Sequence, residues 1–199
     1  FVKLRELMQD GTIGEVISVQ HMEPIEHIHM SHSYVRGNWH NSKSCTPIIL
    51  AKSCHDLDIL RWMTGKPAQK IQAFGDLTWF TKANAPAGWT SRCADGCKAS
   101  GKCPYEASKI YHAGGGWNYV FDLPDAPGEV PQAIRKALAT TDYGRCGYDR
   151  DNDQCDHYIT NSQFAESGTG SFSMEAHTPW GGRRTWGMGR MGFIAGDMS

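Results

Sequence analysis

The last third of the chain reads as a run of β-strands joined by short connections. In residues 169–178, Phe172, Met174 and Ala176 alternate with serine and glutamate side chains. A period of two is typical of a strand with one buried and one solvated face. Three more segments have strand character, namely residues 156–165, 183–189 and 192–197. Short turns between consecutive strands favour antiparallel pairing, so we expect a mainly antiparallel open sheet.

The first two thirds of the chain add helices and two further strands. β-branched residues after a glycine indicate strands at residues 14–23 and 68–80, and helical patterns lie at residues 2–9, 49–65 and 131–141. Gly65 and Pro67 punctuate the end of the second helix, and Pro131 opens the third. The sequence therefore predicts the α+β class, with helices packed on one face of the sheet.

Two stretches resist a regular assignment. Residues 24–47 are crowded with His, Tyr, Trp, Arg and Asn, and residues 82–130 carry glycines and cysteines. Loops commonly hold binding groups, and a long one in a compact domain is often functional or an insertion. We expect one domain, residues 1–199, with an irregular cysteine-bearing insertion at about residues 82–130.

Composition limits the classes of function. The net charge is −1 and 40% of the 199 residues are hydrophobic, which indicates a globular protein and gives no basis for nucleic-acid binding. No apolar run approaches the roughly 20 residues that span a bilayer, so no membrane partner is expected. Seven cysteines, an odd number, and no visible signal peptide favour a reduced, cytoplasmic protein. Because Phe1 opens what reads as a helix already under way, we expect the sequence to begin inside a longer protein.

The segment 49–65 combines a helical pattern with ionisable side chains. Its apolar residues fall all around the helix, which predicts that the helix is largely buried. Lys52, His55 and Asp58 follow one another at intervals of three, along one flank. They either satisfy one another in a structural network or form a catalytic group. In the catalytic interpretation His55 is a general acid/base, Lys52 orients or polarises the substrate, and Asp58 steadies the imidazole ring.

The histidine-rich stretch before this helix is a candidate binding loop. Hydrogen-bonding groups for a polyhydroxylated ligand are available on His32, Tyr34, Arg36 and Asn38, and Trp39 could stack on a sugar face. Packing of these aromatic side chains at the domain edge is the alternative. A metal site among the histidines is disfavoured because no fixed zinc pattern is present.

Three cysteines in the irregular segment are candidate metal ligands. Cys93, Cys97 and Cys103 have the spacing C-x3-C-x5-C, and Cys146 or His112 is available in sequence as a fourth ligand. Zinc or an iron–sulfur centre would suit three or four thiolates. Free structural thiols are the alternative, because a standard zinc ribbon has two C-x2-C pairs.

Five segments together resemble a known family. They are GTIGEVISVQH, HSYVRGNWHN, ILAKSCHDLDILRWMTG, RCADGCKASGKCPYEASKIY and YGRCGYDRDND. They look like successive blocks of the C-terminal domain of the Gfo/Idh/MocA oxidoreductases, which are nicotinamide-dependent sugar and polyol dehydrogenases. In that family a helix with His and Asp three apart lines the active site, and its His transfers a proton. His55 and Asp58 match that pattern, whereas Ala51 stands where many members have an Asp.

The resemblance also implies what a longer parent would supply. The family's N-terminal Rossmann domain carries a GxGxxG phosphate fingerprint and a Glu-Lys-Pro motif. We expect neither of these two motifs within residues 1–199. NAD or NADP would bind to the parent and not to this fragment, which is expected to be inactive alone. The expected partners are a sugar, inositol or polyol substrate and, through the closing strands, further copies in a homo-oligomer. The alternatives are a non-catalytic sugar-binding or oligomerisation domain and a metal-stapled interaction module.

Overall fold

The computed structural model describes residues 1–198 and divides into two compact units. Unit 1 comprises Phe1–Glu26, Ile48–Asp76 and the described part of Cys155–Ser199. Unit 2 comprises His27–Pro47 and Leu77–Gln154, so it includes the irregular segment expected at residues 82–130. Each unit is therefore built from segments that are distant in the sequence.

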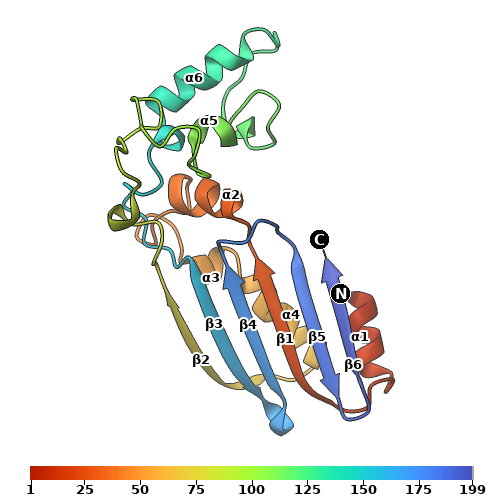
Figure 1. Cartoon of the computed structure of the whole chain (residues 1–199). Helices are drawn as coiled ribbons and strands as arrows, with labels where there is room; N and C mark the ends of the chain where they lie inside the picture. Colours follow the sequence, from red (N-terminus) through yellow and green to blue (C-terminus); the bar gives the residue numbers. More distant parts are fainter. Residues whose placement is uncertain (199) are drawn as a thin grey trace. The chain divides into compact units, whose positions relative to one another are not determined.

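Unit 1 contains a six-stranded open sheet. Its strands are β1 (Val16–Pro24), β2 (Ala68–Asp76), β3 (His157–Phe164), β4 (Thr169–Glu175), β5 (Arg183–Gly189) and β6 (Phe193–Met198). Their order across the sheet is β2-β3-β4-β1-β5-β6 (Figure 1). All neighbours are antiparallel except β1 and β4: β1 lies between β4 and β5 and runs parallel to β4 and antiparallel to β5. The predicted α+β class with a mainly antiparallel sheet is confirmed.

One face of this sheet carries the helices of unit 1. These are α1 (Val2–Gln9), α3 (Ile48–Ala51) and α4 (Cys54–Thr64), and α1 and α4 lie behind the strands in Figure 1. Alternating side chains of the strands, including Val19, Phe172 and Met174, are fully buried on this side. Leu60 and Met63 of α4 are buried as well. The core of unit 1 therefore lies between the sheet and its helices.

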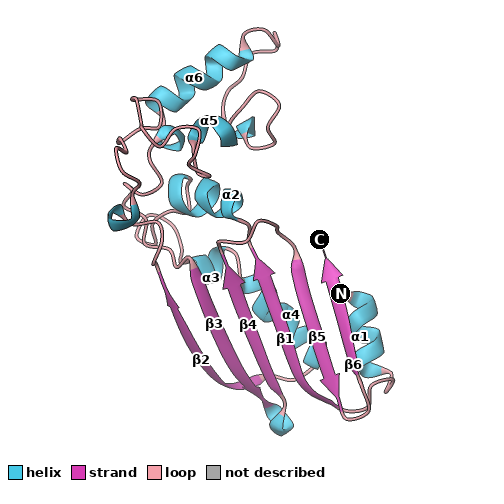
Figure 2. Cartoon of the chain, in the orientation of Figure 1, coloured by secondary structure: helices cyan, strands magenta, loops and turns pink. Residues whose placement is uncertain are grey.

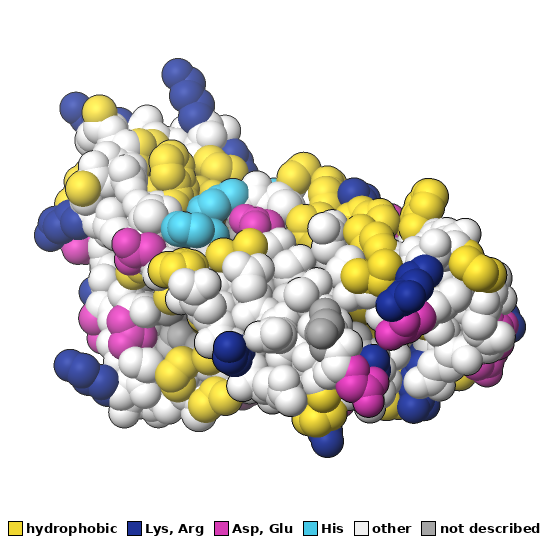
Figure 3. Space-filling view, turned by 90° about the horizontal axis from the view of Figure 1, so that it is seen from below, with side chains coloured by type: hydrophobic (Ala, Val, Ile, Leu, Met, Phe, Trp, Pro, Cys, Tyr) yellow, Lys and Arg dark blue, Asp and Glu magenta, His cyan; other side chains and the backbone are white. Residues whose placement is uncertain are grey.

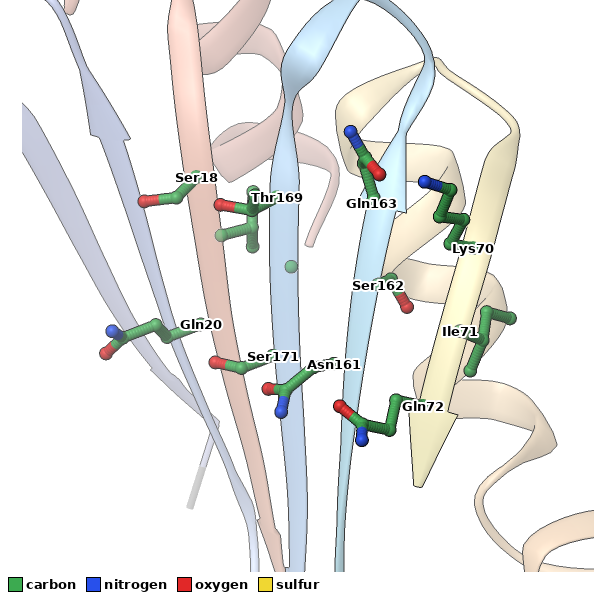
Figure 4. A pocket seen from close by; sticks show the side chains of 12 residues that line it. Ser18, Gln20, Lys70, Ile71, Gln72, Asn161, Ser162, Gln163, Thr169 and Ser171 are labelled. Atoms are coloured by element: carbon green, nitrogen blue, oxygen red, sulfur yellow. The ribbon is translucent and has the colours of Figure 1, made fainter. Parts of the chain in front are cut away.

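The opposite face of the sheet is mainly polar, apart from an exposed cross-strand pair of Phe74 and Ile159. By strand register, Gln20, Ser171, Asn161 and Gln72 form one cross-strand row, and Ser18, Thr169, Gln163 and Lys70 form a second (Figure 4). These side chains line a shallow groove across four strands. The alternation in residues 169–178 predicted this solvated face, and β4 shows the expected pattern of buried and less buried positions.

The prediction of one buried helix at residues 49–65 is wrong in two respects. The chain turns at Lys52 and Ser53, so α3 and α4 are separate helices. The segment is also not buried all round, since Leu50 is 61% exposed. It lies on one side of the sheet and therefore buries only one of its faces. The predicted end is confirmed, because Gly65 takes the left-handed conformation, with φ 68°, after the last turn of α4.

Unit 2 is mostly loop with short helical elements (Figure 2). Its helices are α2 (His27–His29), α5 (Ala107–Ile110) and α6 (Val130–Thr140), and Met30–Arg36 forms a π-helical segment. Short 3-10 turns lie at Lys82–Asn84, Asn118–Val120 and Asp142–Gly144. A small apolar core of Ala107, Ile110, Tyr111, Ile134 and Leu138 holds α5 and α6 together.

The helix predicted from Pro131 is thus present as α6, but the irregular assignment of residues 24–47 is wrong in part. The π-helical segment lies within it, and all seven of its residues are buried. Its many polar side chains conceal the helical pattern, because the partners that satisfy them come from elsewhere in unit 2.

The surface has mixed charge. On the face drawn in Figure 3, Lys and Arg side chains are interspersed with Asp and Glu. Among residues 1–198, no helix has the length and apolar character needed to cross a membrane.

Candidate functional site

A network of buried ionisable side chains lies between the sheet and α4 in unit 1. His21 and Glu23 point to the helix-covered face of β1 because they share the alternation of Val19. Arg183 opens β5, which runs antiparallel to β1, so it lies near the end of β1. Asp56 comes from the first turn of α4. Three elements therefore bring these side chains to one place.

Asp56 is the centre of the network. Its Oδ1 atom accepts hydrogen bonds from His21 Nε2 at 3.0 Å and from Arg183 Nε at 2.6 Å. With Nε2 as the donor, His21 Nδ1 accepts a hydrogen bond from the Thr185 hydroxyl at 2.7 Å. These contacts fix both the tautomer and the orientation of the imidazole ring.

Glu23 extends the network toward the start of α4. Its carboxylate oxygens lie 2.8 Å from Lys52 Nζ and 2.9 Å from Arg183 Nε. Lys52 and Arg183 thus supply two positive charges, and Glu23 and Asp56 supply two negative charges. Such pairing makes it tolerable to bury Glu23 and Asp56 and to bury Lys52 and Arg183 in part.

The network also sets the charge state of Asp56. Burial alone would raise the pKa of this carboxyl, but hydrogen bonds from His21 and Arg183 outweigh it and hold the pKa below the ordinary value. The nearby carboxylates in turn raise the pKa of Arg183, against the effect of burial. Asp56 is therefore an anion at neutral pH and a fixed acceptor.

The predicted triad of Lys52, His55 and Asp58 is not a single buried cluster. Lys52 lies in the turn before α4 and pairs with Glu23. His55 and Asp58 are both exposed, and they remain three residues apart on α4. His55 is thus open to a reactant, and the adjacent residue Asp56 anchors the same helical turn to the sheet.

Sequence reasoning missed the roles of His21, Glu23 and Arg183. The signal for the first two was available, because the alternation of the strand places them on the same face as Val19. Nothing in the local sequence near Arg183 indicates its contact with a helix more than 100 residues earlier.

The predicted substrate loop is mostly internal to unit 2. His32, Tyr34 and Arg36 are each less than 5% exposed, whereas Asn38 and Trp39 are exposed. The His32 ring stacks on Tyr143 with 5.3 Å between centroids, and its Nδ1 atom is hydrogen-bonded to the Tyr111 hydroxyl at 2.8 Å. Burial, reinforced by the positive charge of Arg36, lowers the pKa of His32 to about 4. His32 is therefore a neutral core residue, and we expect no direct substrate contact from it.

The three predicted cysteine ligands line one cavity in unit 2. Cys93, Cys97, Cys103 and also Cys146 face it, together with Arg36, and its volume is about 20 Å³. All four cysteines are free thiols. Burial raises the pKa of Cys103 and of Cys146, and the thiol of Cys93 adds to the rise in both. Among residues 1–198, no three His, Cys, Asp or Glu side chains already lie close enough together to hold a metal ion.

Similar proteins identify the family. Residues 1–112 of the 199 match the GFO/IDH/MocA C-terminal domain. The chain belongs to this family. YteT of Bacillus subtilis (strain 168), which is assigned to the oxidoreductases by its name, is 27% identical over 107 residues. That match covers 52% of the chain but only 24% of YteT, so the chain spans about a quarter of this relative.

Solved structures of GFO/IDH/MocA-like fold agree with the sheet and helices described above. A myo-inositol dehydrogenase from Corynebacterium glutamicum is 11% identical, with a TM-score of 0.52 over 98% of this chain and 37% of that one. A scyllo-inositol dehydrogenase from Lactobacillus casei, with bound NAD(H) and scyllo-inositol, is 15% identical, with a TM-score of 0.51 over the same shares. At these identities the likeness shows the fold alone.

A dinucleotide site of the Rossmann type does not fit the residues described. The glycines at 114–116 follow the short helix α5 and precede a 3-10 turn. Contrary to expectation, the GxGxxG spacing does occur, from Gly187 to Gly192. It joins the antiparallel strands β5 and β6, whereas a phosphate cradle needs a strand followed by a helix N-terminus.

Proposed function

We propose that this chain is the substrate-side portion of a nicotinamide-dependent oxidoreductase that acts on a sugar, inositol or related polyol. Membership of the GFO/IDH/MocA family supports the reaction class. The inositol dehydrogenases of similar fold support the substrate class, and the NAD(H) bound to one of them supports the cofactor class. The cofactor, NAD or NADP, would be held by a part of the parent protein that lies outside this chain.

The observation that carries the proposal is the placement of His55. Its imidazole is exposed on the first turn of α4, one residue from the buried anchor Asp56. An imidazole is the side chain best suited to accept or donate a hydroxyl proton near neutral pH. We assign this proton transfer to His55, with Lys52 and Asp58 in support.

Lys52 and Asp58 would support His55 in different ways. The ammonium of Lys52 is held by Glu23 at 2.8 Å and keeps 17% of its side chain exposed, so it can still polarise a substrate hydroxyl. Asp58 lies one helical turn after His55, where its carboxylate can steady a protonated imidazole. Of the predicted loop residues, only Asn38 and Trp39 are exposed enough to contact substrate.

The test is a His55→Gln substitution in the full-length parent. Loss of general acid/base catalysis should lower kcat about 10²–10⁴-fold and leave the affinity for NAD(H) unchanged. Cys54→Ser, an exposed neighbour on the same turn, is the matched control and should keep the parent's kcat. A kcat for His55→Gln within twofold of the parent would instead favour a non-catalytic sugar-binding or assembly domain.

The isolated chain provides a second test. Residues 1–199 should bind neither NAD nor NADP by isothermal titration calorimetry and should turn over no polyol. Micromolar affinity for either nucleotide would contradict the proposed division between this chain and a separate cofactor domain.

We also expect the parent to be a homo-oligomer. The open face of the sheet exposes Phe74 and Ile159 as a cross-strand apolar pair, at 61% and 41%. Light scattering on the parent should give a dimer or a larger assembly, and a strict monomer would refute this expectation.

A further inference from the structure

Four of the seven cysteines come together although they lie far apart in the sequence. Cys93, Cys97 and Cys103 come from the irregular loop before α5, and Cys146 follows the 3-10 turn after α6. An isolated bridge between Arg92 and Arg145 pairs the backbones just before Cys93 and Cys146. The backbone amide of Cys93 also donates to the Gly144 carbonyl at 3.1 Å. The backbone therefore holds these two cysteine positions side by side.

Arg36 supplies a buried positive charge at the same cavity. Its side chain comes from the π-helical segment and is only 2% exposed. Its Nε and Nη2 atoms donate to the carbonyl oxygens of Arg145 at 2.8 Å and Tyr105 at 2.6 Å, and Nη2 also lies 4.0 Å from Cys93 Sγ. Within the described part of the chain, its Nη1 atom has no hydrogen-bond partner.

One carboxylate, that of Glu106, also lines this cavity, but its oxygens accept hydrogen bonds from Ser100, Gly101 and Ser108. The contacts of the guanidinium are two neutral carbonyls and one sulfur, and an arginine cannot lose its proton in a protein. A buried cation without an anionic partner is costly, by several kcal/mol. Besides Glu106, the cysteine sulfurs at this cavity can become anionic, because metal coordination deprotonates them, and Cys93 Sγ lies 4.0 Å from Arg36 Nη2.

We propose that Cys93, Cys97, Cys103 and Cys146 bind one Zn²⁺ ion as four thiolates, with Arg36 as the compensating cation. Four thiolates and one Zn²⁺ carry a net charge of −2, which Arg36 reduces to −1. On binding, the four thiols release their protons to solvent and four Zn–S bonds form. The cavity of about 20 Å³ suits a single ion, and closing Zn–S distances of about 2.3 Å requires the thiols to rotate toward it.

The first test measures metal on the unaltered chain. Residues 1–199 are reduced, stripped with chelator and reconstituted with Zn²⁺, and metal content is then measured by mass spectrometry. We expect one zinc per chain, and Co²⁺ in its place should give an intense thiolate-to-cobalt charge-transfer band. Less than one tenth of an equivalent of zinc would overturn the proposal, as would stoichiometric iron with acid-labile sulfide.

Alkylation maps the ligands without any substitution. In the zinc-loaded chain, iodoacetamide should modify exposed Cys54 fully and should leave Cys93, Cys97, Cys103 and Cys146 protected until chelator is added. Equal modification of these four with and without zinc would rule out the site.

Variants then distinguish the proposed zinc ligands from a cysteine outside the site and from Arg36. Cys97→Ser and Cys146→Ser should lose stoichiometric zinc, whereas Cys54→Ser should retain it. Arg36→Gln should bind zinc about 10–100-fold more weakly, as expected for a group just outside the ligand shell. Unchanged zinc affinity in Arg36→Gln would contradict the role assigned to this cation.

Discussion

Asp56 is the residue on which the buried network of unit 1 depends. Asp56→Asn replaces the carboxylate between His21 and Arg183 by a neutral amide. The nitrogen donors of His21 and Arg183 then lose their charged acceptor. We expect it to lower the free energy of unfolding by about 3–5 kcal/mol. Asp58→Asn, an exposed position on the same helix, is the matched control and should change it by less than about 0.5 kcal/mol. Urea unfolding followed by circular dichroism measures both, and equal losses in the two variants would count against the network.

His32 predicts a pH effect on stability. Its pKa is about 4 in the folded chain and 6.5 in its ordinary state, so between these values the unfolded chain binds a proton that the folded chain does not. Stability should therefore fall as pH falls from 6.5 to 4, by on the order of 3 kcal/mol from this residue.

The effect of His32 can be isolated by substitution. His32→Asn should lack this part of the pH dependence when its urea unfolding is compared with that of the parent chain at pH 6.5 and 4.5. An NMR titration that placed the His32 pKa near 6.5 would refute the prediction.

At the residue scale, the sequence indicates where ionisable side chains gather but not which of them are buried. His55 is placed on a helix as predicted. The partner of Lys52 is Glu23 and not Asp58, because the chain turns between α3 and α4. His32 and Arg36 read as loop residues since their partners, Tyr111 and Tyr105, lie about 70 or more residues away.

At the scale of elements, Gly65 shows how one backbone conformation ends α4. Its φ of 68° is open to glycine but strained for alanine, and the nearest atom to an added Cβ is 3.7 Å away. The strain in Gly65→Ala would thus lie in the backbone alone, and we expect a loss of about 1–2 kcal/mol in thermal unfolding. Gly65→Asn should lose less, because asparagine tolerates this conformation. A neutral Gly65→Ala would be inconsistent with the observed cap.

The strands are the elements that the sequence predicts best. Alternation sets the two faces of β3 and β4, and that signal is local. It cannot reveal that β1 enters between β4 and β5, since strand order depends on contacts between distant segments. The π-helical segment was missed for a related reason, because its buried polar residues have no helical alternation of apolar and polar positions.

At the scale of the whole molecule, the sheet depends on the end of the chain. Deleting the residues after Ala176 removes β5 and β6, leaves β1 at an exposed edge and deletes Arg183. We expect this truncated chain to lose cooperative unfolding and to aggregate. Deleting only the residues after Gly189 removes the edge strand β6 and should leave a folded, less stable chain. Size-exclusion chromatography and thermal unfolding measure the two truncated chains. Cooperative unfolding of the chain that ends at Ala176 would contradict the prediction.

The central place of β1 has a consequence for synthesis on the ribosome. β1 ends at Pro24, whereas its partner β5 begins only at Arg183. At 5–20 residues per second, the ribosome exposes β1 on the order of ten seconds or more before β5 emerges. All of unit 2 is translated in that interval, because both of its segments lie between β1 and β3. The nascent chain can therefore fold unit 2 first, and β1, with its ionisable residues His21 and Glu23, must remain unpaired and soluble until translation is nearly complete.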